Sequence, residues 1–308
     1  MVSVIIPTYN RSAFLTESIN SVLNQSFNDI EIVIVDDNGK SSHLQKENAK
    51  KLSTLINDNK IKYIAHEHNL NGSAARNTGI KNSRGDYIAF LDDDDLYEPT
   101  KIEHQLNDMI SKHSLASLSY FTRFYGDKGK EQITIDSSKI TLENVLRQNV
   151  DTCSGSSLIV SRKILDMIGF FDESFTRMQD IEFLARICKV TTVTVCEEYL
   201  TNVRMHSDNE SNNVVDGKKY EKTILHFIDK FRNEIDLLND KKTIISDFYY
   251  RIAKNYLKNK HILKFLSWLI KTKRPIKYAF KTIRDLNASK KRKKVLKAEK
   301  NNEKNSIF

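Results

Sequence analysis

The sequence GDYIAFLDDDDLYEP, from Gly85 to Pro99, is the stretch around which the chain is organised. The apolar run Tyr87 to Leu91 predicts a buried parallel strand, and four aspartates follow directly at its C-terminal end. Ligands of open α/β sheets bind beyond the carboxyl ends of strands, and adjacent carboxylates repel each other unless a cation offsets their charge. The stretch therefore predicts a divalent metal site that holds a phosphorylated ligand.

The alternative interpretation of the aspartates is a solvated acidic turn that caps a helix starting near Pro99. An EF-hand is disfavoured, because the glycine that such a loop needs at its sixth position would fall on Tyr97. Four carboxylates behind one apolar strand favour the metal site.

Strands and helices alternate through the first hundred residues. Before the aspartate run we expect strands at Val2–Pro7, Ile30–Asp37 and Ile61–Ala65, helices over Leu15–Gln25 and Leu44–Ile56, and a loop entering a short helix within Asn69–Ser83. The face of the first helix consists of Leu15, Ile19, Val22 and Leu23. This alternation predicts a parallel, doubly wound sheet with its ligand at the strand ends.

The pattern changes to mixed α+β after Ser114. We expect a hairpin from residues 118–126 and 131–136, further strands at Ser156–Ser161 and Val190–Cys196, and two helices between Lys218 and Asn259.

Composition limits the class of protein. The chain has 308 residues, 39% of them hydrophobic, enough for one large α/β domain or two smaller ones. Cys153, Cys188 and Cys196 lack metal-binding spacing, which predicts reduced thiols in a cytosolic protein. The N-terminal residues do not resemble a signal peptide, and no apolar run approaches the ~20 residues that cross a bilayer.

The two parts of the chain carry opposite charge. Lys218 to Phe308 holds 26 Lys and Arg against 9 Asp and Glu, a net +17, whereas the first 217 residues carry −8. The apolar residues of Ile262 to Ile283 lie among lysines, which predicts a basic helix on an anionic membrane surface. The alternative is that Leu263 to Ile270 packs on the domain. We expect disorder from about Ser289.

Several of these motifs occur together in one known family. The chain resembles glycosyltransferase family 2, of the A-type glycosyltransferase fold, over about residues 1 to 210. The resemblance rests on SVIIPTYNR, the acids Asp36 and Asp37, the segments Ala74–Ile80 and Met178–Phe183, and the aspartate run. It implies a Rossmann-like mixed α/β sheet flanked by helices, and transfer of a sugar from a nucleotide diphosphate with inversion.

The resemblance also implies roles for individual residues. Those facing the nucleotide would be Pro7, Thr8, Tyr9, Asn10, Asp37, Arg76, Asp92 and Asp93, with Asp37 accepting the ring N–H of uracil. Asp94 would bind Mn²⁺ or Mg²⁺ together with His206, or with Asp208 as the alternative. Asp180 would be the catalytic base. Gln179 departs from the Glu-Asp pair that is usual at this point, and Glu182 is a candidate for orienting the acceptor.

We therefore expect a metal-dependent, inverting transferase that moves one sugar from a UDP-sugar to a glycan or lipid-linked acceptor in cell-surface polysaccharide or glycoconjugate synthesis. Its expected domains are a transferase domain at 1–217, a basic helical extension at 218–288 and a basic tail at 289–308. We expect a peripheral protein of the inner face of the plasma membrane that binds no nucleic acid. A single tryptophan, Trp268, outside any Gln-x-x-Arg-Trp segment disfavours processive synthesis.

Two competing functions are a sugar nucleotidyltransferase and an inactive transferase-like scaffold whose basic tail binds membrane or nucleic acid. The nucleotidyltransferase is disfavoured because the turn after the first strand, PTYNR, contains no glycine. The presence of all the expected acids argues against the scaffold.

Overall fold

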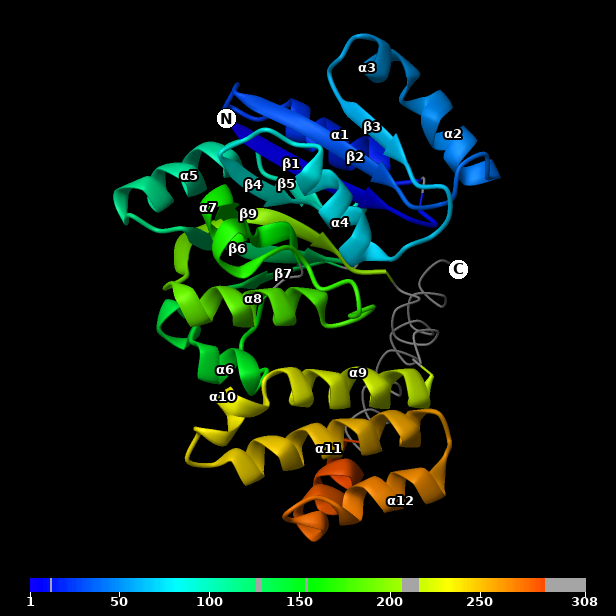
Figure 1. The fold of residues 1–308 in the computed structure, drawn as a ribbon, viewed down its shortest axis with the longest axis vertical. Helices are drawn as coiled ribbons and strands as arrows, with labels where there is room; N and C mark the ends of the chain where they lie inside the picture. The colour runs from blue at the N-terminus through cyan, green and yellow to red at the C-terminus, as the bar shows by residue number, and fades with distance from the viewer. Residues whose placement is uncertain (12, 126–128, 153–154, 207–215, 286–308) are drawn as a thin grey trace, which may run out of the picture. The chain divides into compact units, whose positions relative to one another are not determined.

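The computed structural model describes residues 1–308 except 12, 126–128, 153–154, 207–215 and 286–308. The chain divides into two compact units, Met1–Asn212 and Asn213–Phe308 (Figure 1). Cys153, Asp208 and the tail from Ser289 lie outside the described residues.

Over its described residues, the first unit is built on a nine-stranded mixed sheet, in the order β3-β2-β1-β4-β8-β6-β9-β5, with β7 paired to β6. Strands β3, β2, β1 and β4 are parallel, and β8 joins β4 in antiparallel orientation. The strands are β1 Val2–Thr8, β2 Ile30–Asp36, β3 Lys62–Ala65, β4 Tyr87–Phe90, β5 Leu96–Tyr97, β6 Ala116–Phe124, β7 Lys130–Ile133, β8 Ile159–Ser161 and β9 Thr194–Arg204. The predicted fold class, a mixed α/β sheet flanked by helices, is confirmed.

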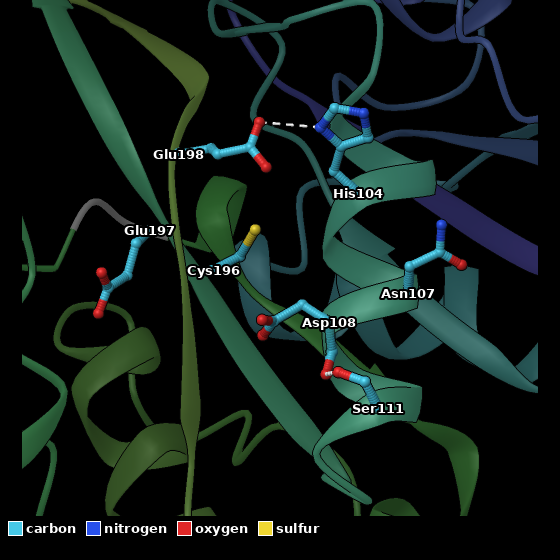
Figure 2. Close-up of a pocket in the computed structure, with 7 residues that line it drawn as sticks. All are labelled: His104, Asn107, Asp108, Ser111, Cys196, Glu197 and Glu198. Atoms are coloured by element: carbon cyan, nitrogen blue, oxygen red, sulfur yellow. Dashed lines mark hydrogen bonds and ion pairs between the residues drawn. The ribbon is translucent and has the colours of Figure 1, made fainter.

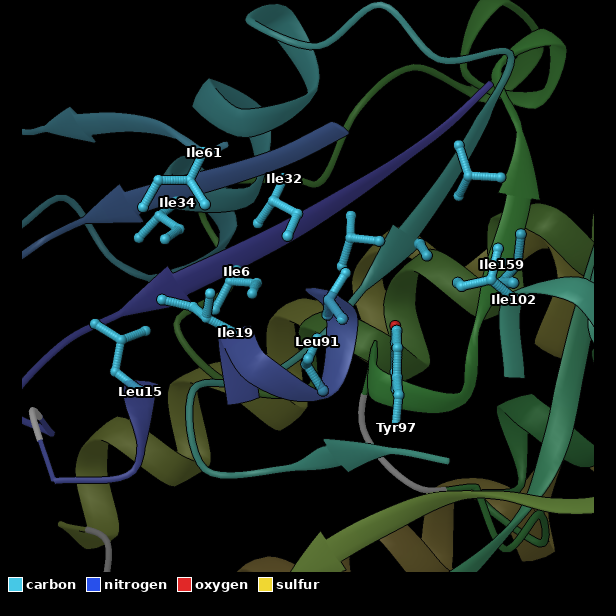
Figure 3. Packing of buried hydrophobic residues seen from close by; sticks show 14 of the residues in the cluster. Ile6, Leu15, Ile19, Ile32, Ile34, Ile61, Leu91, Tyr97, Ile102 and Ile159 are labelled. Carbon is cyan, nitrogen blue, oxygen red and sulfur yellow. The ribbon is translucent and has the colours of Figure 1, made fainter. Parts of the chain in front are cut away.

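Helices cover both faces of the parallel part of the sheet, as near-continuous apolar strands require (Figure 1). The helices of this unit are α1 Leu15–Leu23, α2 His43–Lys51, α3 Ser53–Asn57, α4 Gly72–Lys81, α5 Lys101–Ser111, α6 Leu142–Leu146, α7 Arg162–Ile168 and α8 Gln179–Val190. On one face Leu15, Ile19 and Val22 of α1 pack with Ile6 and Ile34 of the sheet (Figure 3). The fourth predicted contact residue of α1, Leu23, is 39% exposed.

The opposite face is closed by α4. Ala75 of this helix packs with Val33 and Val35 of β2. Gly79, one turn further on, lies against Ile5 of β1, and a Cβ atom at Gly79 would stand 2.4 Å from the Ile5 Cγ2 atom. The absence of a side chain at Gly79 therefore allows α4 to pack closely against β1.

Two predicted elements of the first unit differ from the structure. The single helix over Leu44–Ile56 is two short helices that meet at Leu52. The strand predicted at Val190–Cys196 begins only at Thr194, because α8 continues to Val190, and it extends to Arg204. Its later residues include exposed Glu197 and Glu198, which obscure the apolar alternation by which strands are recognised.

The second unit is helical over the residues that the structure describes. Its helices are α9 Gly217–Lys230, α10 Arg232–Asp236, α11 Lys241–Lys258 and α12 Ile262–Ile270, followed by helical residues 275–285. Three helices therefore replace the two predicted between Lys218 and Asn259. None of the described helices is both long and apolar enough to span a membrane.

The contact between α4 and β1 generates a test of the fold. We expect Gly79→Ala to lower the free energy of unfolding by about 1–3 kcal/mol, because the added methyl group overpacks the interface with Ile5. In an Ile5→Ala background, which removes the contacted atoms, the same change becomes neutral or stabilising, since alanine favours a helix over glycine by about 1 kcal/mol. Urea unfolding of the four proteins of this double-mutant cycle measures the coupling. Equal effects of Gly79→Ala in both backgrounds would contradict the packing described.

Candidate active site

The carboxyl ends of three neighbouring parallel strands bring the predicted site residues to one edge of the sheet. The register aligns Thr8 of β1 with Asp36 of β2, and Ile5 of β1 with Phe90 of β4. The aspartate run follows β4 after only one further residue, Leu91. Segments that are about thirty and eighty residues apart in sequence therefore meet at this edge.

Each aspartate of the run has a different partner. Asp92 Oδ1 accepts a hydrogen bond from Arg76 Nη2 at 2.6 Å, and Asp93 Oδ2 accepts one from the Thr8 hydroxyl at 2.7 Å. Burial raises the pKa of Asp93 to about 7, even though the hydrogen bond from Thr8 opposes the shift. These two carboxylates thereby join α4 and β1 to the end of β4.

Asp94 lies beside His206, the residue predicted to share a metal with it. His206 Nε2 stands 2.8 Å from Asp94 Oδ2, and the guanidinium of Arg11 also pairs with this carboxylate. Arg204, at the end of β9, donates from Nε to the Asp94 carbonyl at 3.1 Å and positions the segment that carries His206. The structure thus brings the two predicted ligands together.

A divalent cation fits this pair in its chemistry. One carboxylate and one imidazole leave several positions for phosphate oxygens and water, as is usual for Mg²⁺ or Mn²⁺ bound with a nucleotide. Among the described residues, no group of three or more His, Cys, Asp or Glu side chains could hold a metal ion by itself. A metal ion at this pair would therefore complete its coordination with phosphate oxygens or water.

The fourth aspartate serves the fold. Asp95 is 2% exposed and accepts hydrogen bonds from the Ser156 hydroxyl at 2.6 Å and from the Arg204 amide at 3.0 Å. Burial raises the pKa of Asp95 well above its usual range. Its carboxylate joins the η3 turn (Gly155–Ser157) and strand β9 to the aspartate run.

The acid pair after β2 is also buried, and its hydrogen bonds lie within the protein. Asp36 accepts from Asn48 Nδ2 at 2.8 Å and from the Tyr63 hydroxyl at 2.7 Å. Asp37 accepts from the Asn69 side chain at 2.7 Å and from the Leu70 and Asn71 amides at 2.8 and 3.0 Å. These bonds fix the loop that leads into α4, next to the turn that follows β1.

The turn after β1 contains the remaining residues predicted to face the nucleotide. Pro7 and Thr8 end the strand, the Tyr9 side chain is 49% exposed, and Asn10 adopts a left-handed backbone conformation with φ 58°. The Asn10 amide donates to Asn38 Oδ1 at 2.8 Å, which ties this turn to the one after β2. The exposed Tyr9 ring is therefore the accessible aromatic surface at this corner.

Asp180, the predicted base, begins α8 beside Arg76. The Oδ1 atom of Asp180 is inaccessible and has no hydrogen-bond partner among the described residues. Burial raises its pKa; the Arg76 charge opposes this shift and the Asp92 charge adds to it. Asp180 lines a cavity of about 10 Å³ together with apolar residues that include Leu118, Phe171 and Phe183.

Arg76 connects this base to the aspartate run. Its side chain is almost fully buried, and it donates to Gln179 Oε1 at 2.8 Å as well as to Asp92. The Gln179 side chain accepts from Arg76 Nη1 without placing a further negative charge beside Asp92 and Asp180, whereas Arg76 Nε has no hydrogen-bond partner among the described residues. Glu182, predicted to orient an acceptor, is instead fully buried and paired with Arg186 at 2.6 Å.

Sequence reasoning overlooked three residues of the site. Arg11 and Arg204 both contact Asp94, and Gly155 lies where a Cβ atom would be 3.7 Å from Arg76 Nε and from Asp180 Oδ1. Arg11 directly follows the predicted nucleotide turn, and Arg204 lies two residues before His206, so proximity in sequence was the available signal. Nothing in the sequence around Gly155 distinguishes it from a loop glycine.

A second hollow lies away from this edge, between α5 and β9 (Figure 2). It measures about 500 Å³, and among its lining residues His104 pairs with Glu198 at 2.8 Å. The Cys196 thiol is buried there, and burial raises its pKa to about 11. Cys188 and Cys196 are both free thiols. None of the predicted site residues lines this hollow.

Comparison with known sequences identifies relatives over most of the chain. The family model for glycosyl transferase family 2 matches residues 3–169. An uncharacterized glycosyltransferase of Rickettsia felis is 33% identical over 70% of this chain and 36% of its own length. One from Methanocaldococcus jannaschii is 30% identical over 71% of this chain and 76% of its own length. The chain thus matches about a third of the length of the Rickettsia felis relative.

Solved structures share the fold. Residues 1–349 of TarS from S. aureus, in complex with UDP-GlcNAc, superpose with a TM-score of 0.64 at 21% identity, covering 87% of this chain and 79% of that one. The mannosyltransferase PcManGT from Pyrobaculum calidifontis, in complex with GDP-Man and Mn²⁺, has a TM-score of 0.55 at 14% identity, covering 87% and 74%. The family match shows that the chain belongs to glycosyl transferase family 2, and the solved structures share its fold.

Proposed function

We propose that this glycosyltransferase moves one sugar from a UDP-sugar to an acceptor hydroxyl, with inversion at the anomeric carbon. The observation that carries the proposal is the link from Asp92 through Arg76 to Asp180. Arg76 contacts Asp92 and lies beside Asp180, so a phosphate-binding edge and a candidate base share one buried cation. A sugar bound between them would have its leaving group on one side and its attacker on the other.

The donor is assigned to the turns after β1 and β2. The accessible Tyr9 ring offers a surface against which a base can stack, and Pro7, Thr8 and Asn10 complete the turn. Asp37 is an acceptor only, which suits the ring N–H of uracil, and the base would have to displace one of its present donors. That TarS was solved with UDP-GlcNAc supports a uridine donor, whereas PcManGT was solved with GDP-Man.

Asp94 and His206 would hold Mn²⁺ or Mg²⁺, while Asp92 and Asp93 face the nucleotide side of the site. The cation supplies charge stabilisation of the leaving diphosphate. Arg11 already pairs with Asp94, so its guanidinium is available to the same phosphates once a cation takes over that carboxylate. The Mn²⁺ in the PcManGT complex supports this assignment.

Asp180 would remove the proton of the acceptor hydroxyl as the oxygen attacks the anomeric carbon and the bond to the diphosphate breaks. Its Oδ1 atom has no hydrogen-bond partner among the described residues and so has a free acceptor position, which the acceptor hydroxyl would reach once the side chains that now cover this atom move. Its raised pKa makes it a stronger base than an exposed aspartate. We propose a glycan or lipid-linked acceptor used at the cytoplasmic side in cell-surface polysaccharide or glycoconjugate synthesis.

The first test concerns the donor and the metal. We expect UDP to bind in the presence of Mn²⁺ and to lose at least about tenfold in affinity with excess chelator, because Asp94 then repels the diphosphate. Asp94→Asn should remove the metal dependence while Asp166→Asn, at an exposed aspartate of α7, retains it. Isothermal titration calorimetry measures both. Equal UDP affinity with Mn²⁺ and with chelator would contradict the metal assignment.

The second test concerns the base. We expect Asp180→Asn to lower the turnover number by about 10²–10⁴-fold while UDP affinity stays nearly unchanged, since the base acts on the acceptor. A screen of UDP-sugars for steady-state hydrolysis or transfer provides the assay. Retention of most of the activity would assign the base to another residue.

The third test uses the stability cost of the same carboxylate. A raised pKa means that the folded protein binds the Asp180 proton more tightly than the unfolded chain, so folding loses stability as pH rises through the folded-state pKa. We expect Asp180→Asn to be more stable than the natural protein at neutral pH, with a difference that shrinks as pH falls towards the ordinary carboxyl range. Thermal unfolding against pH measures this, with Asp166→Asn as the control. A less stable Asp180→Asn at neutral pH would rule out the burial cost.

A further inference from the structure

Two consecutive helical segments of the second unit expose a group of large apolar side chains. They are Ile262, Leu263, Leu266 and Ile270 of α12 together with Ile276, Phe280 and Ile283 of helical residues 275–285, which we call the apolar surface. Their exposed fractions range from 45% to 84%. Isolated exposed apolar residues are ordinary, but seven on two successive helical segments are not.

The packing of α12 shows that this exposure is a second, separate face. Trp268 and Leu269 of the same helix are 6% exposed, and Leu269 packs with Tyr250 of α11 and with Tyr278. Trp268 Nε1 donates to Glu221 of α9 at 3.0 Å. The helix therefore already contributes a core face, and the predicted alternative, in which Leu263 to Ile270 simply packs on the domain, describes only Trp268, Leu269 and partly buried Phe265.

The same segments are strongly cationic. Residues 258–285 contain nine lysines and arginines and a single acid, Asp285, which pairs with Lys254 at 2.9 Å. Among the cations, exposed Lys264 and Lys277 directly follow the apolar-surface residues Leu263 and Ile276, and exposed Lys273 lies in the turn between Ile270 and Ile276. Long aliphatic stems with charged ends can reach from an apolar layer into a polar one.

We propose that the apolar surface inserts into the headgroup region of an anionic lipid bilayer, with the surrounding lysines and arginines contacting lipid phosphates. A face that combines exposed aliphatic and aromatic side chains with dense positive charge has the composition of an interfacial helix. The proposal would place the proposed transfer reaction at a membrane surface. It is argued from the exposed side chains of the second unit and not from residues of the candidate active site.

Charge favours a lipid surface over two other occupants. In a dimer formed through this surface, the nine lysines and arginines of residues 258–285 in one copy would face the same nine in the other, with one acid per copy to offset their repulsion. Nucleic acid would match the charge but would leave the aliphatic side chains without apolar partners. An anionic bilayer satisfies both components.

Co-sedimentation of the full chain with vesicles tests the proposal, without donor or metal. We expect binding to vesicles of roughly equal phosphatidylglycerol and phosphatidylcholine, weakened by added salt, and little binding to phosphatidylcholine alone. Leu263→Ser, Ile270→Ser, Ile276→Ser and Phe280→Ser combined should lower the partition coefficient at least about tenfold. Lys264→Gln, Lys273→Gln and Lys277→Gln combined should weaken binding only to the anionic vesicles.

Leu237→Ser is the matched control, because Leu237 is 85% exposed in the same unit but is not part of the apolar surface. It should bind vesicles like the natural protein, and unchanged thermal unfolding of all variants would show that they fold. Undiminished vesicle binding by the fourfold serine variant would overturn the proposal. So would a natural protein that ignores vesicles and forms a dimer which the serine substitutions dissociate. If the natural protein bound vesicles but showed no transferase activity, only the proposed function would be contradicted.

Discussion

Mutual repulsion among Asp92, Asp93, Asp94 and Asp95 is the constraint on which the site depends. Four adjacent carboxylates at one strand end are stable only where other parts of the chain supply donors or cations. Here the partners come from separate segments, namely the helix α4, the end of β1, the η3 turn and the end of β9. The aspartate run thereby joins the parallel and antiparallel parts of the sheet. The hydrogen bonds and ion pairs that offset the repulsion among the aspartates are therefore also contacts that hold separate segments of the fold together.

A similar conflict between charge and burial governs the region of Asp180. The inaccessible Oδ1 atom costs stability, and the nearby Arg76 offsets only part of this cost. A neutral Gln179 accepts a hydrogen bond from Arg76, and Gly155 lies beside both the guanidinium and the carboxylate. A residue kept in such a state at the expense of stability is typical of a functional group.

The second unit uses its apolar residues differently from the first. In the first unit, helices bury one apolar face against the sheet, and Leu23 is among the few large residues left exposed on α1. In α12 both sides are apolar, with Trp268 and Leu269 in the core and Leu263 outside it. Because a soluble helix normally needs only one apolar face, the second face distinguishes this unit.

The sequence alone predicted most helices and strands, the parallel sheet and the acids at the strand ends, because periodicity and strand-end acids are local properties of the chain. The A-type fold was predicted from the family resemblance. The family resemblance predicted that Asp94 and His206 share a metal, and the structure places the two side chains 2.8 Å apart. The sequence did not reveal Arg204, Gly155 or the burial of Glu182, and it predicted the wrong start for β9. The contact of Arg204 with Asp94 joins residues 110 positions apart, and Gly155 approaches Arg76 from a distant part of the sequence, so neither can be read from local patterns. The sequence also did not show which apolar residues of α12 are buried and which are exposed, because that depends on which of them neighbouring helices cover.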